Sequence, residues 1–155
     1  MTNTILLTLG LLLVPPMGDT QSAPTDEQAV RATVEDFLDR LGSRRIDTLD
    51  DDLTSTALVI VSRQRDGAFE TSVRTAAEWL AGMRQGTPGA PFREPLTNVQ
   101  VTVDSGSLAY VRADFEVVRD GQVLSSGVDH FTLVRQPEGW KLAVIAYTSI
   151  PRARP

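Results

Sequence analysis

Asp129 is the side chain whose surroundings in the sequence best fit acid–base chemistry. It lies in a strand-like run in which Gly127 and Phe131 share its face, because side chains alternate along a strand. A carboxylate among small and apolar neighbours loses hydration, so it must be paired or protonated, and its pKa should rise. Asp129 is therefore the candidate catalytic acid. In the alternative, structural role, it binds a backbone N–H or an arginine such as Arg63 or Arg93 and orders the pocket.

Other polar residues near this run carry weaker signals. His130 should face the opposite side of the strand, which favours the surface or a dimer interface over a general base. Tyr147 could donate a hydrogen bond to a ligand if its strand turns it inward. Arg63 ends a strand and could hold an anionic ligand group, although an ion pair with Glu70 or Glu78 is the simpler expectation.

The composition of the 155-residue chain is that of one ordinary globular domain, with 41% hydrophobic and 23% charged residues. Its 15 basic and 20 acidic residues give a net charge of −5, and the arginines are scattered. This argues against nucleic-acid binding, which needs clustered positive charge. The absence of cysteine excludes disulfides, thiolate metal sites and cysteine nucleophiles. A single histidine and an acidic run at 50–52 without EF-hand spacing predict no metal site, and we expect no cofactor.

Residues 1–23 have the layout of a secretory signal peptide. The apolar run at 5–14 is too short to span a bilayer, which takes about 20 residues, and Pro15-Pro16 and a polar segment follow it. We therefore expect a secreted or periplasmic protein with no membrane association after cleavage. The first four residues carry no Lys or Arg and no typical cleavage site is evident, so a buried N-terminal strand or helix is the alternative.

The domain is predicted to span residues 24–150, followed by a disordered tail at 151–155. Two helices begin with capping boxes, in which Thr25 and Thr75 are each followed three residues later by Gln or Glu. Apolar residues recur every three or four positions behind both caps, as on the buried face of a helix. Helices are expected at 25–42 and 75–85, with a shorter helical turn at 46–53 and a proline-rich loop at 86–95.

Strand-like segments make up the rest of the domain. The last three lie within residues 107–150 and are joined by Asp120-Gly121, a type I′ turn signal, and by Pro137-Glu138-Gly139. Further strands are expected at 57–63, 68–72 and 96–103. This order of elements predicts an α+β fold in which a curved antiparallel β-sheet wraps around the N-terminal helices.

Three sequence features carry a resemblance to a known family: the helix ending LDRLGSRRIDTLDDDLTSTA, the Asp129-His130-Phe131 triplet, and the closing LVRQPEGWKLAVIAYT. Through them the segment from about Asp26 to Ile150 resembles the nuclear transport factor 2-like superfamily, which includes ketosteroid isomerases, polyketide cyclases and scytalone dehydratase. The resemblance implies a cystatin-like cone with an internal pocket, and a homodimer. It does not imply one activity, because this fold hosts many functions.

The resemblance also implies a role for Asp129. Its match in ketosteroid isomerases is a protonated aspartic acid that donates a hydrogen bond to the developing enolate. The match of the isomerase tyrosine is Phe37, which has no hydroxyl group, and the general base falls at Val61 or Ser62. Neither can take a proton from carbon near neutral pH. These departures argue against ketosteroid isomerisation by that mechanism.

The predicted pocket is mostly apolar. Its expected lining residues are Phe37, Val61, Trp79, Ala109, Val111, Ala113, Phe115, Phe131 and Tyr147. We therefore predict an exported domain that binds a small hydrophobic molecule. One alternative is an isomerase-, dehydratase- or cyclase-like enzyme that uses Asp129 as its pocket acid, which requires a second titratable or hydroxyl side chain beside it. The other is a homodimerisation or protein-interaction module that uses the outer face of the sheet.

Overall fold

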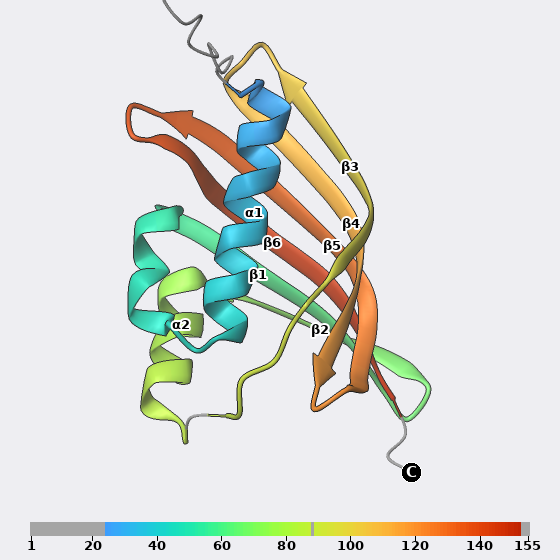
Figure 1. The fold of residues 1–155 in the computed structure, drawn as a ribbon. Coiled ribbons are helices and arrows are strands. Elements are labelled where there is room, and N and C mark those ends of the chain that lie inside the picture. Colours follow the sequence, from blue (N-terminus) through green and yellow to red (C-terminus); the bar gives the residue numbers. More distant parts are fainter. Residues whose placement is uncertain (1–23, 88, 153–155) are drawn as a thin grey trace, which may run out of the picture.

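The computed structural model describes residues 24–87 and 89–152, so the predicted signal peptide lies outside the described residues. One sheet of six strands has the order β2-β1-β6-β5-β4-β3. The helical elements are α1 (Asp26–Gly42), η1 (Ile46–Thr48), η2 (Asp50–Asp52) and α2 (Ala76–Gln85). This is the predicted α+β architecture, with α1 lying across the curved sheet (Figure 1).

The strands are long and mostly antiparallel. They are β1 (Leu53–Arg65), β2 (Ala68–Thr75), β3 (Leu96–Asp104), β4 (Leu108–Arg119), β5 (Gln122–Gln136) and β6 (Gly139–Pro151). Each strand pairs antiparallel with its neighbour in the sheet, except that β1 pairs parallel with β6. The sheet is therefore mixed, and it differs from the predicted antiparallel sheet at this one pairing. Because no hairpin joins β1 to β6, no local sequence signal sets their relative direction.

Local sequence signals fix the helix starts and two hairpins. Both predicted capping boxes form, at Thr25 and at Thr75. In the β1–β2 and β4–β5 turns, both central residues have positive φ: 49° and 85° at Asp66 and Gly67, and 50° and 76° at Asp120 and Gly121. Type I′ turns need this backbone conformation, which glycine and aspartate tolerate better than most residues.

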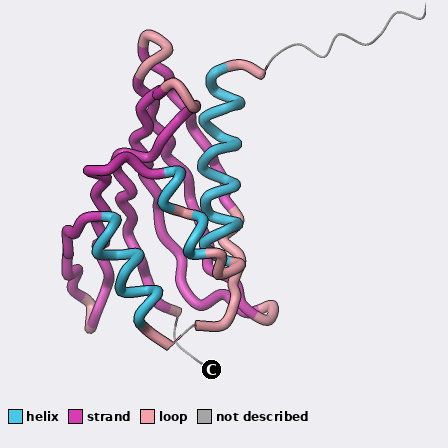
Figure 2. Tube along the Cα trace, turned by 90° about the vertical axis from the view of Figure 1, so that its left-hand side faces the viewer, coloured by secondary structure: helices cyan, strands magenta, loops and turns pink. Residues whose placement is uncertain are grey.

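The hydrophobic core lies between α1 and the inner face of the sheet. The largest fully buried side chains come from both layers: Phe37, Phe131, Leu49, Leu80, Leu133, Leu142, Val30, Val34, Val59 and Val111. In the view of Figure 2, the long helix α1 stands alongside the strands, and the shorter helical segments lie beside its lower half. Burial of this apolar stripe holds α1 in place, since a lone helix of this length is marginal in water.

A bulge in β6 decides which of its side chains face inward. Thr132 lies opposite Val144 and Leu133 lies opposite Leu142, so Ala143 is an extra residue on β6. Trp140 and Leu142 are buried before the bulge, whereas Ile145 and Ser149 are buried after it. The bulge therefore reverses the alternation of side chains and turns Tyr147 toward the inner face.

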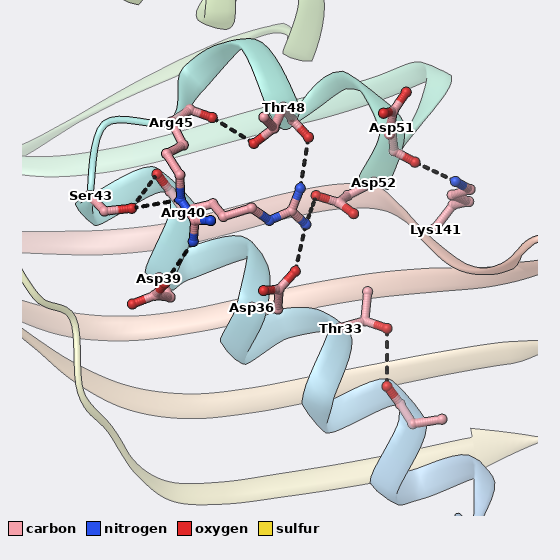
Figure 3. A network of polar contacts seen from close by, with 11 residues as sticks. Thr33, Asp36, Asp39, Arg40, Ser43, Arg45, Thr48, Asp51, Asp52 and Lys141 are labelled. Carbon is pink, nitrogen blue, oxygen red and sulfur yellow. Dashed lines mark hydrogen bonds and ion pairs between the residues drawn. The ribbon is translucent and has the colours of Figure 1, made fainter.

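An ion pair and a hydrogen bond from Arg40 connect the η1–η2 segment to α1 (Figure 3). The Arg40 guanidinium lies between Asp36 and Asp52, and its Nη1 donates a hydrogen bond of 2.7 Å to the Thr48 carbonyl oxygen. Asp50 is paired with Arg84 of α2. The acidic run at 50–52 therefore joins the two helices through ion pairs.

The C-terminal end of the sheet extends further than predicted. Pro151 pairs with Ser125, and the Arg152 N–H donates a hydrogen bond of 2.8 Å to the Leu124 carbonyl oxygen. These two residues continue the pairing of β5 with β6 rather than belonging to a disordered tail. Among the residues that the structure describes, no helix is both long and apolar enough to cross a membrane.

Candidate functional site

A cavity of about 320 Å³ lies between the helices and the inner face of the sheet. Its apolar wall is formed by Phe37, Leu38, Leu41, Trp79, Met83, Phe92, Phe115, Val117, Leu124, Phe131 and Ile145. Its polar groups come from Arg44, Arg63, Glu94, Arg119, Ser125, Asp129, Tyr147 and Ser149. An apolar wall with a few converging polar groups is typical of a small-molecule site.

Asp129 is one of the polar residues that line this cavity. It occupies β5 between Ala113 of β4 and Tyr147 of β6, and only 2% of its surface is exposed, as its strand alternation predicts. Its Oδ2 atom is buried and receives no hydrogen bond from any residue that the structure describes. A buried oxygen without a donor is costly, so this carboxyl is better satisfied if it carries a proton and donates.

Glu94 supplies the acceptor, and sequence reasoning missed it. Glu94 belongs to the loop between α2 and β3, and backbone hydrogen bonds hold this loop in place at two positions. The Phe92 N–H donates to the Gly42 carbonyl oxygen at 3.0 Å, and Arg93 and Val118 exchange two backbone hydrogen bonds of 2.9 and 2.8 Å. These bonds bring Glu94 over the end of β4 and against Asp129. The one sequence feature that could have pointed to Glu94 is that it is the single acidic residue in the 86–95 loop.

The two carboxyls behave as one acid pair. Burial, the nearby Glu94 charge and a hydrogen bond to Glu94 together raise the pKa of Asp129 to about 8, and burial contributes most. Burial raises the pKa of Glu94 and the hydrogen bond from Asp129 lowers it, and the net result is a pKa of about 7. One proton is therefore shared near neutral pH, with Asp129 as donor and Glu94 as acceptor, and the pair titrates as a unit.

Tyr147 places a hydroxyl group near the acid pair. Burial raises the pKa of its phenol; the positive charges of Arg63 and Arg74 oppose this rise, and the two carboxyls add to it. Its ring packs edge-on against Phe115, with ring centroids 6.3 Å apart. The phenol stays protonated at neutral pH, so it can donate a hydrogen bond to a ligand oxygen.

The structure brings most of the predicted pocket residues to one cavity. Phe37, Trp79, Phe115, Phe131 and Tyr147 line it together with Asp129.

The remaining predicted residues lie elsewhere. Val61 lines an adjoining groove rather than the cavity itself. Ala109, Val111 and Ala113 point inward as their alternation predicts, but they are buried rather than on the cavity wall, and the first two belong to the core cluster with α1. Alternation along a strand gives the direction of a side chain, not whether the space beside it is filled.

The structure also shows where the side chains of Arg63 and His130 lie. The expected ion pair of Arg63 is wrong, because Glu70 pairs with Arg65 at 3.5 Å and Glu78 caps α2 through Thr75. His130 is exposed on the outer face of β5, as predicted. Within residues 24–87 and 89–152, no group of three His, Asp or Glu side chains is placed to hold a metal ion.

Comparison with known proteins identifies the family. A family model described as "Putative lumazine-binding" matches residues 25–148, which is most of the chain. The chain belongs to this family. No curated protein matches the sequence.

Solved structures share the fold of this lumazine-binding-like chain. A nuclear transport factor 2-like protein with a cystatin-like fold from Novosphingobium aromaticivorans is 19% identical, with a TM-score of 0.60 over 79% of this chain and 80% of that chain. From the same organism, a protein described as a "Putative Scytalone Dehydratase" is 15% identical, with a TM-score of 0.58 over 78% of this chain and 81% of that chain. A third protein from this organism, described as the β subunit of a "putative aromatic-ring-hydroxylating dioxygenase", is 11% identical, with a TM-score of 0.64 over 83% of this chain and 92% of that chain. These likenesses confirm the nuclear transport factor 2-like fold.

Proposed function

We propose that the cavity binds a small, largely apolar molecule that presents an oxygen or nitrogen atom to the Asp129–Glu94 pair. The observation that carries this proposal is the cavity itself, which is apolar on most sides and ends in an acid pair without a cationic partner. A ligand of this kind would bury its rings against Phe37 and Trp79, which stack with centroids 6.5 Å apart. The family name adds support, because lumazine is a flat bicyclic molecule with carbonyl and N–H groups.

A cavity-filling variant tests the proposal. Met83 lines the cavity from α2 and is half-buried, so Met83→Trp should occupy ligand space while the fold is retained. Ala77→Trp, on the exposed face of the same helix, is the matched control. We expect calorimetric titration with lumazine and with 2-naphthol to show binding to the wild type and to Ala77→Trp, and at least about tenfold weaker binding to Met83→Trp. Equal binding to all three proteins would place the ligand outside the cavity, and no binding to the wild type would remove the main support for the proposal.

A second candidate function is proton transfer next to a carbonyl group, and the shared proton favours it. Glu94, as the ionised member of the pair, would take a proton from the carbon beside the carbonyl, while Asp129 donates a hydrogen bond to the carbonyl oxygen. The negative charge that develops on oxygen is thereby stabilised, and return of the proton to carbon completes the cycle. A base with a pKa near 7 suits this reaction at neutral pH.

Deuterium exchange distinguishes this enzyme from a binding protein. We expect the wild type to accelerate deuterium incorporation into 2-tetralone in D₂O, as followed by NMR, because a basic carboxylate and an acid flank the cavity. Glu94→Gln should remove the acceleration while ketone binding persists. If the wild type binds the ketone but exchange runs at the uncatalysed rate, the protein does not catalyse this reaction with 2-tetralone. The binding function would then still stand.

We also propose that the protein works outside the cytoplasm, on the support of the apolar run at 5–14 and the polar segment after it. Expression of the full chain in a bacterial host, followed by cell fractionation and intact-mass measurement, tests this. A product in the periplasm that has lost about 23 residues is expected. A cytoplasmic product of full length would contradict it.

A further inference from the structure

Three arginines that line the cavity have no acidic partner among the described residues. Seven of the thirteen described arginines form ion pairs with aspartate or glutamate, as Arg40 does with Asp52. The other six form no such pair with the described residues; of these, Arg44, Arg63 and Arg119 line the cavity, whereas Arg74, Arg93 and Arg152 do not. The chain has more acidic than basic residues, with a net charge of −5. A shortage of carboxylates therefore does not explain why these arginines form no ion pair.

Of these three arginines, Arg63 and Arg119 have guanidinium groups that form no hydrogen bond or ion pair with the described residues. Arg44 is already engaged: its Nε donates to the Gly89 carbonyl oxygen at 3.0 Å and its guanidinium lies 5.5 Å from the centre of the Phe92 ring. Arg63 makes no hydrogen bond or ion pair with another described side chain. Arg119, at the end of β4, has a buried Nε atom without a hydrogen-bond partner in the described chain. A buried donor of this kind is costly unless something binds it.

These cations stand apart from the acid pair. Val61, Tyr147 and Asp129 lie side by side across β1, β6 and β5, and Arg63 follows Val61 by two residues. Two residues of strand advance about 7 Å, so Arg63 is one step nearer to the strand end than the acid pair. The pKa of Asp129 reflects burial and Glu94, with no arginine among its causes. Arg63 and Arg119 thus line the same cavity as the acid pair, from β1 and β4 and at other strand positions than Asp129.

We infer that the ligand is an organic acid. Its carboxylate is held by Arg63 and Arg119, its apolar ring body fills the cavity, and a hydroxyl or carbonyl oxygen at its other end meets the Asp129–Glu94 pair. Guanidinium groups suit this role because their fork of N–H donors matches the two oxygens of a carboxylate. This inference rests on the proposed binding function and specifies the class of ligand.

A matched pair of probes tests it. The probes are 6-hydroxy-2-naphthoate and its methyl ester, which have the same rings and hydroxyl group but differ in charge. Fluorescence titration of the wild-type protein should show the acid binding at least about tenfold more tightly than the ester, as expected for a charge-assisted hydrogen bond. The preference should shrink as salt is added, because the arginines are partly exposed.

Arginine variants assign the preference to these two side chains. Arg63→Gln and Arg119→Gln should each bring the affinity of the acid close to that of the ester, while ester binding stays unchanged. Arg31→Gln, an exposed residue of α1, is the control for net charge and should keep the full preference. Equal wild-type affinity for acid and ester would overturn the inference and leave the binding function intact. Tight acid binding that survives both cavity variants would also overturn it, whereas failure of both probes together with lumazine would count against the binding function itself.

Discussion

The proton shared by Asp129 and Glu94 makes the free energy of unfolding depend on pH. Both carboxyls have a higher pKa in the folded protein than the value of roughly 4 in an unfolded chain. The folded state therefore keeps protons that the unfolded state has lost. The stabilisation is fully present below about pH 4 and is lost as the pH rises through about 7 and then about 8. We expect the urea midpoint of the wild type to fall between about pH 4 and about pH 8 and to level off above that range.

Asp129→Asn should remove most of this pH dependence. The amide stays uncharged and can donate to the Glu94 carboxylate, so only one ionisable group remains in the pair. Urea unfolding at several pH values between about 5.5 and 9 measures the slope. Glu116→Gln, at an exposed carboxylate on β4, is the control and should keep the wild-type slope. An Asp129→Asn midpoint that falls as steeply as that of the wild type would show that the pair is not the titrating unit.

Gly127 is required beside the acid pair for a steric reason. A Cβ atom at this position would lie 1.9 Å from the Thr148 carbonyl oxygen and 2.8 Å from the Phe115 ring. Gly127→Ala should therefore lower the free energy of unfolding by about 1–3 kcal/mol, the usual cost of overpacking. Gly82→Ala on α2, where nothing lies within 4 Å, should instead raise it by about 0.5–1 kcal/mol. Equal urea midpoints for the two variants would contradict the close approach of β5 and β6.

At the scale of elements, the loop before β3 determines where Glu94 lies. A Cβ atom at Gly42 would lie 2.5 Å from the Phe92 carbonyl oxygen, so Gly42→Ala should push this loop away from the end of α1. We expect the variant to lose part of the pH dependence of its urea midpoint and to bind cavity ligands less tightly. Ser43→Ala, one residue further along at the exposed end of the helix, should change neither. Wild-type pH dependence in Gly42→Ala would show that the loop does not need this contact to place Glu94.

Elements defined by local sequence were predictable. Thr25 and Thr75 cap helices because their side chains and the residues three positions later satisfy each other's backbone donors. Asp120-Gly121 turns a hairpin because both residues tolerate positive φ. The inward direction of Asp129 also followed from local alternation, since no bulge separates it from buried Phe131.

The partners of Asp129 depend on features that a single sequence does not reveal. The direction of Tyr147 depends on the extra residue at Ala143, which sequence alternation alone does not show. The position of Glu94 depends on backbone hydrogen bonds to Gly42 and Val118, which are distant in sequence. A proline-rich loop has no periodicity from which such a path could be read.

At the scale of the whole molecule, no element within residues 24–87 and 89–152 covers the outer face of the sheet. The exposed large hydrophobic residues are Leu58, Phe69, Val73, Tyr110 and Ile150. Strand alternation and register place all of them on the side of the sheet opposite the core. We propose that a second copy of the chain covers this face, since exposed apolar patches of this kind are typical of interfaces.

Sedimentation velocity at several protein concentrations tests this dimer. The wild type should dissociate on dilution, and Tyr110→Glu should be monomeric at concentrations where the wild type is dimeric, because a buried carboxylate is costly. Glu35→Lys, a charge change on the opposite, helical side, should sediment as the wild type does. A wild type that sediments as a monomer at every concentration would contradict the proposal.

The parallel pairing of β1 with β6 has a consequence for the order of folding. Strands β3 to β6 follow one another along the chain and can pair through short connections, whereas β1 reaches β6 only after most of the domain has been synthesised. Pairings between distant segments carry a larger loop-closure entropy and form more slowly. Asp129 and Tyr147 therefore come together with the early hairpins, while Arg63 joins them with the late pairing. We therefore expect a chain that has formed only its hairpins to hold Asp129, Tyr147 and Arg119 in place while Arg63 is still missing from the cavity.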